Sequence, residues 1–315
     1  MELSTPIVFE PLFMERVWGG RRLETSFGKR LPVGMRIGES WEIVDRPEAQ
    51  SVVHEGPLRG ATLHDLWTCH REEIFGHDLP KTGRFPLLCK MLDAQDRLSI
   101  QVHPPVAVAA RLHGEPKEEM WYVMEATLNS ELYLGFKPGV TRESFEQALR
   151  ECHVTDQVHQ VFAKKGDAIL LPSGRIHAIG AGNVMVEVQQ NSDTTYRVFD
   201  WNRQGLDGRP RDLHVEESLA SINFNDVEPS IAAAPGEGPL VECEHFRVER
   251  WQLDAPRACA TSDRFAIFTV VEGAVDCGDR AFKSGSFFLA PPALAQLELR
   301  PVDGHATVLR TTIPR

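Results

Sequence analysis

The chain has 315 residues, of which 42% are hydrophobic and 25% are charged, so a packed core is expected and extensive disorder is not. Its formal net charge is −11 and no cluster of lysine and arginine stands out, which argues against partners such as nucleic acid or an anionic membrane surface. No apolar run approaches the roughly 20 residues of a membrane span, and the first residues do not have the pattern of a signal peptide.

Short runs with strand character dominate the chain. Gly, Pro and Asp residues separate these runs, which is typical of an all-β sandwich or barrel. The predicted strands cover residues 40–44, 98–102, 120–124, 131–134, 168–171, 184–189 and 196–199. Three helices are expected between them: one runs from an N-cap at Thr62 to Gly76, and the others cover 141–151 and 214–222.

A stretch rich in Pro, Gly and Ala, residues 225–239, is typical of a linker. Strand-like sequence resumes after it, so two units are expected, residues 1–235 and 236–315. The pattern Gly-x5-Pro occurs in both units, at 166–172 and at 285–291, which indicates two similar β-barrels. In the first copy His177 follows the glycine by 11 residues, whereas Gln296 holds that place in the second. Only the first unit is therefore expected to bind a metal.

Polar and apolar side chains alternate along residues 98–103, which is the period of a strand with two different faces. Ser99, Gln101 and His103 share one face. If that face lies inside a barrel, Gln and His together indicate a metal site, whereas a half-exposed strand would simply place them in water.

Two further segments supply metal-ligand candidates. Glu119 begins an apolar strand, and His177 follows a Pro-x-Gly turn between apolar neighbours. Two imidazoles, one carboxylate and one amide oxygen would suit Zn2+. Two histidines and a carboxylate also hold Fe2+ in oxygenases, so these residue types alone do not choose between the metals.

The order of the motifs resembles a known family. Residues 166–177 are similar to the second motif of the cupin barrel, and Gln101–His103 followed by Glu119 resembles the first. The chain also resembles the short bacterial form of type I mannose-6-phosphate isomerases in a series of blocks in the same order, at 18–20, 38–43, 99–104, 117–119, 172–177 and 187–197. This resemblance implies a mainly β fold, with a cupin-type jelly-roll catalytic domain and a smaller, degenerate cupin-like barrel after it.

The resemblance also implies a cofactor and a reaction. One Zn2+ per chain would be held by four ligands, Gln101, His103, Glu119 and His177. The reaction would interconvert mannose 6-phosphate and fructose 6-phosphate through an enediol. Arg197 matches the family's active-site arginine and would lie near the enediolate or the phosphate. The catalytic candidates are Arg197, Lys117 and Glu187, and the substrate-binding candidates are Trp18, Ser99, Lys117 and Arg197. The proton carrier stays open among Lys117, Glu187 and a zinc-bound water.

Two other functions remain possible on the residues alone, an Fe(II) cupin oxygenase and a non-catalytic sugar-binding cupin. The expected partner is a small phosphosugar, and the expected state is a monomer or homodimer. Six scattered cysteines without a CxxC pair favour free thiols and a cytoplasmic location. Histidines outside the ligand set, including His214, are not expected to take part in the site.

Overall fold

The computed structural model describes residues 5–231, 236–259 and 263–314. The strands before the linker are β1 (Leu12–Gly20), β2 (Ile37–Ile43), β3 (Asp45–Arg46), β4 (Ala49–Gln50), β5 (Leu87–Ala94), β6 (Ile100–Val102), β7 (Glu119–Ala126), β8 (Glu131–Phe136), β9 (Val158–Phe162), β10 (Ala168–Leu171), β11 (His177–Ile179), β12 (Asn183–Gln190) and β13 (Tyr196–Phe199). The later strands are β14 (Gly238–Glu242), which includes the last two residues of the predicted linker, and β15 (Arg247–Leu253), β16 (Arg257–Ala258), β17 (Ala266–Cys277), β18 (Arg280–Lys283), β19 (Phe287–Ala290) and β20 (Glu298–Thr312). The helices are α1 (Arg22–Thr25), α2 (Leu63–Cys69), α3 (Arg71–Phe75), α4 (Val106–Ala109), α5 (Arg142–Arg150) and α6 (Val215–Ser221), with short 3-10 turns at η1 (Ala110–Leu112), η2 (Val154–Asp156) and η3 (Pro292–Leu294).

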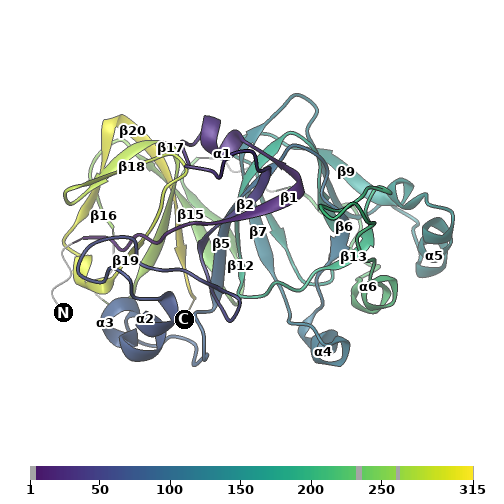
Figure 1. Ribbon diagram of the computed structural model, residues 1–315, viewed down its shortest axis with the longest axis horizontal. Coiled ribbons are helices and arrows are strands. Elements are labelled where there is room, and N and C mark those ends of the chain that lie inside the picture. Colours follow the sequence, from purple (N-terminus) through teal and green to yellow (C-terminus); the bar gives the residue numbers. More distant parts are fainter. Residues whose placement is uncertain (1–4, 232–235, 260–262, 315) are drawn as a thin grey trace.

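Three antiparallel sheets build the molecule, which confirms the predicted mainly β architecture (Figure 1). The first has the strand order β1-β2-β5-β12-β7-β10, and the second has the order β13-β6-β11-β8-β9. The third contains only these later strands, in the order β14-β15-β20-β17-β18, with β16 paired to β20 and β19 paired to β17. The small β3–β4 pair stands apart from them.

The local signals account for the helix positions. Thr62 caps α2 in a capping box, in which its side chain accepts from the Asp65 N–H and the Asp65 carboxylate accepts from the Thr62 N–H. The helix predicted to run on to Gly76 is instead two helices, because the chain leaves helical geometry at His70 before α3 begins. Gly76 ends α3 with a φ of 89°, a conformation that favours glycine. The other two predicted helices correspond to α5 and α6.

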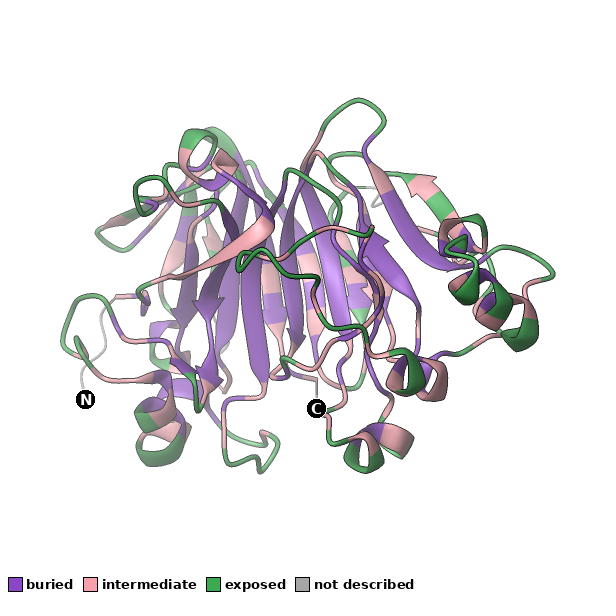
Figure 2. Cartoon of the chain, turned by 45° about the vertical axis from the view of Figure 1, so that its right-hand side comes forward, coloured by how far each residue is buried: buried purple, intermediate pink, exposed green. Residues whose placement is uncertain are grey.

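The first sheet is covered on both faces. Val184, Val186 and Val188 of β12 belong to one large apolar core, which also contains Trp251 and Phe268 from the third sheet. The alternate residues Met185 and Glu187 point the other way, toward the second sheet, as expected from the period of a strand. The third sheet therefore forms the back wall of the first one, and Figure 2 shows the resulting run of buried strands.

The second sheet has helices over its outer face. Phe145 of α5 and Ile222 after α6 pack in one cluster with Ile100, Tyr196 and Val198. Figure 1 places α6 beside β13 and α5 farther out, at the end of the molecule away from the third sheet. The inner faces of the first two sheets are thus left to enclose a cavity between them.

The two Gly-x5-Pro segments adopt the same local structure. Gly166 (φ 92°) precedes β10 and Gly285 (φ 87°) precedes β19, and a proline follows each strand. The interior of the C-terminal unit is filled by stacked rings, with Phe288 between Phe282 and Phe268 at centroid distances of 4.1 and 5.3 Å. The predicted unit boundary after residue 235 falls on residues 232–235, which lie outside the described residues, so it stays a prediction. No described helix combines the length and apolar character that crossing a membrane requires.

Candidate functional site

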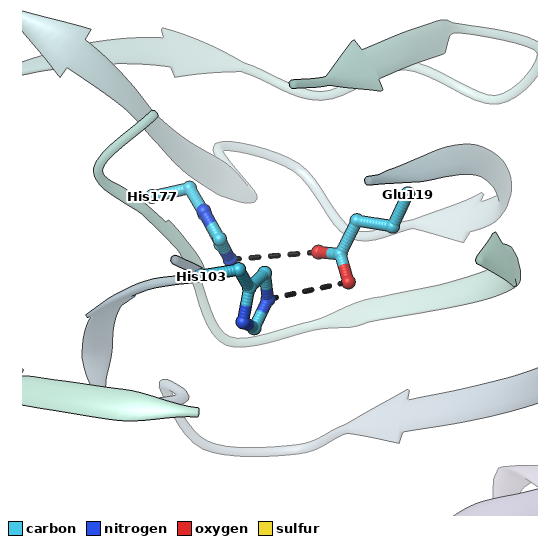
Figure 3. Close-up of side chains that lie close together, drawn as sticks. All are labelled: His103, Glu119 and His177. Carbon is cyan, nitrogen blue, oxygen red and sulfur yellow. Dashed lines mark ion pairs between the residues drawn. The ribbon is translucent and has the colours of Figure 1, made fainter. Parts of the chain in front are cut away.

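Three buried side chains meet between the first two sheets. His103 directly follows β6, His177 begins β11, and Glu119 begins β7 in the facing sheet. One ligand atom from each lies within 4.8 Å of the others. Nε2 of His103 is 3.3 Å from Glu119 Oε2, and Nε2 of His177 is 3.4 Å from Glu119 Oε1 (Figure 3). The predicted His, Glu and His ligands are therefore brought together.

Backbone carbonyls fix the tautomer of both imidazoles. Nδ1–H of His103 donates to the Thr194 carbonyl at 2.8 Å, and Nδ1–H of His177 donates to the Arg175 carbonyl at 2.9 Å. A carbonyl can only accept, so each Nε2 turns a lone pair toward Glu119. Burial lowers the pKa of His103 to about 4, with a further contribution from the Lys117 charge, and burial also lowers the pKa of His177. Both rings are neutral at neutral pH, as metal ligation requires.

Glu119 has two fully buried oxygens, and neither accepts a hydrogen bond from any described residue. Burial raises the pKa of this carboxyl, but Lys117, His103 and His177 outweigh that effect and hold the pKa well below its usual range. The Lys117 ammonium lies 2.9 Å from Oε2. No proton lies between the two rings and the carboxylate, and the Lys117 ammonium contacts only Oε2, so a bound metal cation would offset the remaining cost of burying these lone pairs.

Gln101 borders the triad from the middle of β6. Its backbone is in register with His177, and its amide nitrogen lies 3.3 Å from His177 Nε2. The Ser99 hydroxyl donates to the Gln101 Oε1 at 3.2 Å. Exchanging the amide nitrogen and oxygen by a flip would turn Oε1 toward the triad, so Gln101 can reach the site as the predicted fourth ligand.

A cavity of about 650 Å³ opens beside the triad. All of the predicted catalytic and substrate-binding side chains line it, as does Gln101; they are Trp18, Ser99, Lys117, Glu187 and Arg197. Lys117 and Gln101 connect this cavity to the triad, since each also contacts a triad side chain. The structure thus gathers residues from six separate segments into a single site.

Glu187 belongs to a row of side chains across the first sheet. Lys90 on β5 and Trp121 on β7 are its register partners on either side. The Lys90 ammonium lies 3.0 Å from Oε1, and the Trp121 indole N–H donates to Oε2 at 3.0 Å. Burial lowers the pKa of Lys90, but the Glu187 and Glu39 carboxylates outweigh it and raise the pKa above its usual range. Trp121 also makes an edge contact with the His177 ring, at a centroid distance of 5.4 Å.

The sequence interpretation missed several side chains of this cavity. Lys90 could have been identified from the sequence, because a lysine in the middle of the apolar segment 87–92 is expected to be buried and therefore to need a charged partner. Arg16, Arg211 and His214 also line the cavity. They had no such signal, since their segments have an ordinary surface composition and only the fold brings them to the site.

Comparison with known proteins places these residues in a family context. Residues 8–147 match the family described as phosphomannose isomerase type I, catalytic domain. The chain is 34% identical to the mannose-6-phosphate isomerase ManA of Bacillus subtilis (strain 168), over 96% of this chain and 97% of that protein. It is similar to the crystal structure of the mannose 6-phosphate isomerase from Bacillus subtilis, with a TM-score of 0.86 and 30% identity, covering 98% of this chain and 100% of that one. A zinc-bound mannose 6-phosphate isomerase shares the fold at 16% identity, with a TM-score of 0.74 and coverage of 99% and 100%. These likenesses confirm the expected cupin-type fold.

Proposed function

The chain belongs to the type I phosphomannose isomerase family, and we propose that it interconverts mannose 6-phosphate and fructose 6-phosphate through an enediol. One structural observation supports this most directly: a buried set of two imidazoles and one carboxylate adjoins a cavity that is lined by Arg197 and by the fixed carboxylate of Glu187. The catalytic cavity is large enough for one hexose phosphate. The near-full-length likeness to the mannose-6-phosphate isomerase ManA of Bacillus subtilis favours this reaction over the oxygenase and passive sugar-binding alternatives.

Zinc is the proposed cofactor, at one ion per chain. The residues present fit it, because two neutral imidazole nitrogens and one carboxylate converge and an amide lies within reach. His103, Glu119, His177 and Gln101 would hold the ion. When bound, zinc supplies Lewis-acid polarisation of the sugar carbonyl and stabilises developing negative charge. Iron would find the same ligand types, and the family relationship is what favours zinc.

Glu187 is the proposed group that moves the proton between the two sugar carbons. It lines the cavity, and both of its fixed neighbours, the Lys90 ammonium and the Trp121 indole, are donors. These contacts set the carboxylate's orientation and leave its remaining lone pairs for the substrate. Lys117 is held 2.9 Å from Glu119, so it is better placed to stabilise charge beside the triad than to carry the proton.

Trp18 and Ser99 complete the sugar-facing wall. Trp18 is 3% exposed and presents an apolar ring to the cavity, which suits the C–H face of a sugar. The Ser99 hydroxyl contacts the Gln101 side chain and would accept from its amide nitrogen in the flipped orientation, so it acts by fixing that amide. The Arg197 guanidinium makes no hydrogen bond with a side chain of the described residues, although the Asp200 and Asp193 carboxylates act on its charge, so it can bind an anionic group.

A coupled isomerase assay on protein of known metal content tests this proposal. Mannose 6-phosphate should be converted, chelation should abolish turnover, and added Zn2+ should restore it. Metal-dependent oxygen uptake without isomerisation, or tight sugar binding without turnover at full zinc occupancy, would contradict it. A His245→Ala variant serves as a matched control, because this histidine lies outside the cavity and its ion-pair distance to Glu118 is 4.0 Å.

The remaining expectations are part of the same proposal. The substrate is a phosphosugar, and the protein works in the cytoplasm as a monomer or homodimer. All six cysteines are free thiols in the structure, which agrees with a reducing compartment.

A further inference from the structure

The strand β9 is an open edge of the second sheet. It stands at one end of the strand order, and on the side away from β8 it pairs with no strand of the described residues. Figure 1 places β9 on the side of the molecule away from the third sheet. An edge strand presents unpaired backbone N–H and C=O groups, which makes it a template for pairing with another chain.

Other edge strands of the molecule carry features that block such pairing, and β9 does not. β14 contains Pro239, β18 carries Arg280 and Lys283, and register shifts interrupt the pairing of β1 with β2. β9 has the sequence Val-His-Gln-Val-Phe, without proline, glycine, lysine, arginine or an acidic residue. The shift in its pairing with β8 places the extra residue in β8, so β9 itself stays regular. Its edge is therefore suited to another strand.

The hydrogen bonds at the ends of β9 show which of its backbone groups are free for a partner. The Ala163 N–H donates to the Ser130 carbonyl at 2.8 Å, and the Gln157 carbonyl accepts at 2.9 Å from the residue that follows β8. Bonded and non-bonded pairs alternate along an antiparallel ladder, so the odd-numbered residues turn their backbone groups toward β8. The backbone groups of the even-numbered residues, among them Gln160 and Phe162, therefore point to the open edge.

The outward row of β9 is complementary to its own reverse. If a second copy pairs antiparallel around a two-fold axis at Gln160, that residue faces its own copy and Val158 faces Phe162. Just beyond the strand ends, Asp156 and Lys164 are equally far from Gln160 along the chain, so each carboxylate would face an ammonium of the other copy. Both of these charged side chains are exposed, and the Phe162 ring is 59% exposed. Pairing would cover the ring and form two ion pairs.

We propose that β9 is a dimer interface, at which a second copy of this chain adds its own β9 and joins the two second sheets into one continuous sheet. The occupant is a second copy because an isologous contact needs a self-complementary patch, and the row from Asp156 to Lys164 is one. No residue of β9 lines the catalytic cavity, so the interface does not depend on the proposed isomerase function. A single short strand pair makes a small interface, so the dimer should dissociate reversibly on dilution.

Sedimentation velocity of the full-length protein tests the interface. The weight-average mass should rise from that of a monomer toward that of a dimer between about 1 and 200 μM. Asp156→Lys and Lys164→Asp each place like charges opposite one another twice per dimer, so each should raise the dimer dissociation constant about 10-fold. The double variant Asp156→Lys/Lys164→Asp restores both ion pairs with the signs exchanged. Its dissociation constant should return to within about 3-fold of the starting value.

Gln160→Pro removes an N–H at the centre of the proposed pairing without removing a hydrogen bond to β8, and it should also raise the dissociation constant at least about 10-fold. Lys81→Asp is the control for the charge change, because this exposed lysine lies between α3 and β5 and should leave the constant unaltered. A protein that stays monomeric at every concentration overturns the interface. So does a double variant no tighter than the single ones, or a dimer that Gln160→Pro leaves intact. Circular dichroism checks the fold of each variant, and the charge exchange keeps the test decisive if Gln160→Pro does not fold.

Discussion

Replacing Lys90 by methionine should destabilise the fold and slow turnover, because it removes the cation from a buried ion pair. Lys90 and Glu187 are each 4% exposed, and their charged atoms are 3.0 Å apart. Methionine has a similar length and would still pack against Trp41, over whose ring the ammonium lies at 5.2 Å. The packing therefore changes little, and the variant isolates the effect of the charge.

The expected loss of folding stability depends on the carboxylates that remain buried after Lys90 is replaced. Without Lys90, the carboxylates of Glu187 and Glu39 face the cavity with fewer positive neighbours. Breaking a buried pair by removing one partner typically costs about 3–5 kcal/mol. The lower end applies here, since Glu187 borders a cavity that admits water. A loss of about 3 kcal/mol is a large fraction of an ordinary stability of about 5–15 kcal/mol.

Chemical denaturation of a double-mutant cycle measures this coupling. Lys90→Met, Glu187→Gln and the double variant should give a coupling energy above about 1.5 kcal/mol, with the double variant more stable than Lys90→Met alone. Lys165→Met is the control, because its pair with Glu272 is more than half exposed and should contribute less than about 1 kcal/mol. Losses that add to within about 0.5 kcal/mol would refute the assignment of Lys90 as the partner of Glu187.

Three further outcomes are expected. His177→Ala should lose both zinc and isomerase activity, and zinc retained at full occupancy in elemental analysis would remove His177 from the ligand set. Burial raises the pKa of Glu39, but Lys90 and Arg16 outweigh it and lower the pKa from 4.5 to about 2, so this group stabilises the fold above pH 4.5. About 3 kcal/mol of folding stability should be lost as the pH falls from 4.5 to about 2. Denaturation curves of the Glu39→Gln variant should depend less steeply on pH over the same range. Phe265→Ala should cost about 3–5 kcal/mol, because this ring packs edge-on against Phe75 and Phe85. Calorimetry should still show one transition, and two separated transitions would contradict a shared core.

How far the sequence predicted the site depended on whether a residue's signal was local. Gln101, His103 and Glu119 were recognisable because strand alternation and motif spacing constrain neighbouring residues. Trp18 and Arg197 were recognisable through the order of the family blocks. His214 and Arg211 were not, since they reach the cavity only through the path of the chain after β13. The break between α2 and α3 was missed for a related reason, because an apolar helical period continues across His70.

The third sheet packs behind only one of the two sheets that enclose the cavity, so the two walls of the cavity are supported differently. The first sheet carries Glu119, Glu187 and Lys90. Its opposite face packs into the large core that contains Trp251 and Phe268. Arg197 and His214 stand on the second sheet and its following segment, whose outer face packs against the helices α5 and α6. The carboxylates are thus held on a sheet that is packed on both faces, whereas Arg197 and His214 lie on a side with a smaller core behind it. The third sheet therefore supports the proposed proton transfer, because it holds in place the sheet from which Glu119 and Glu187 project.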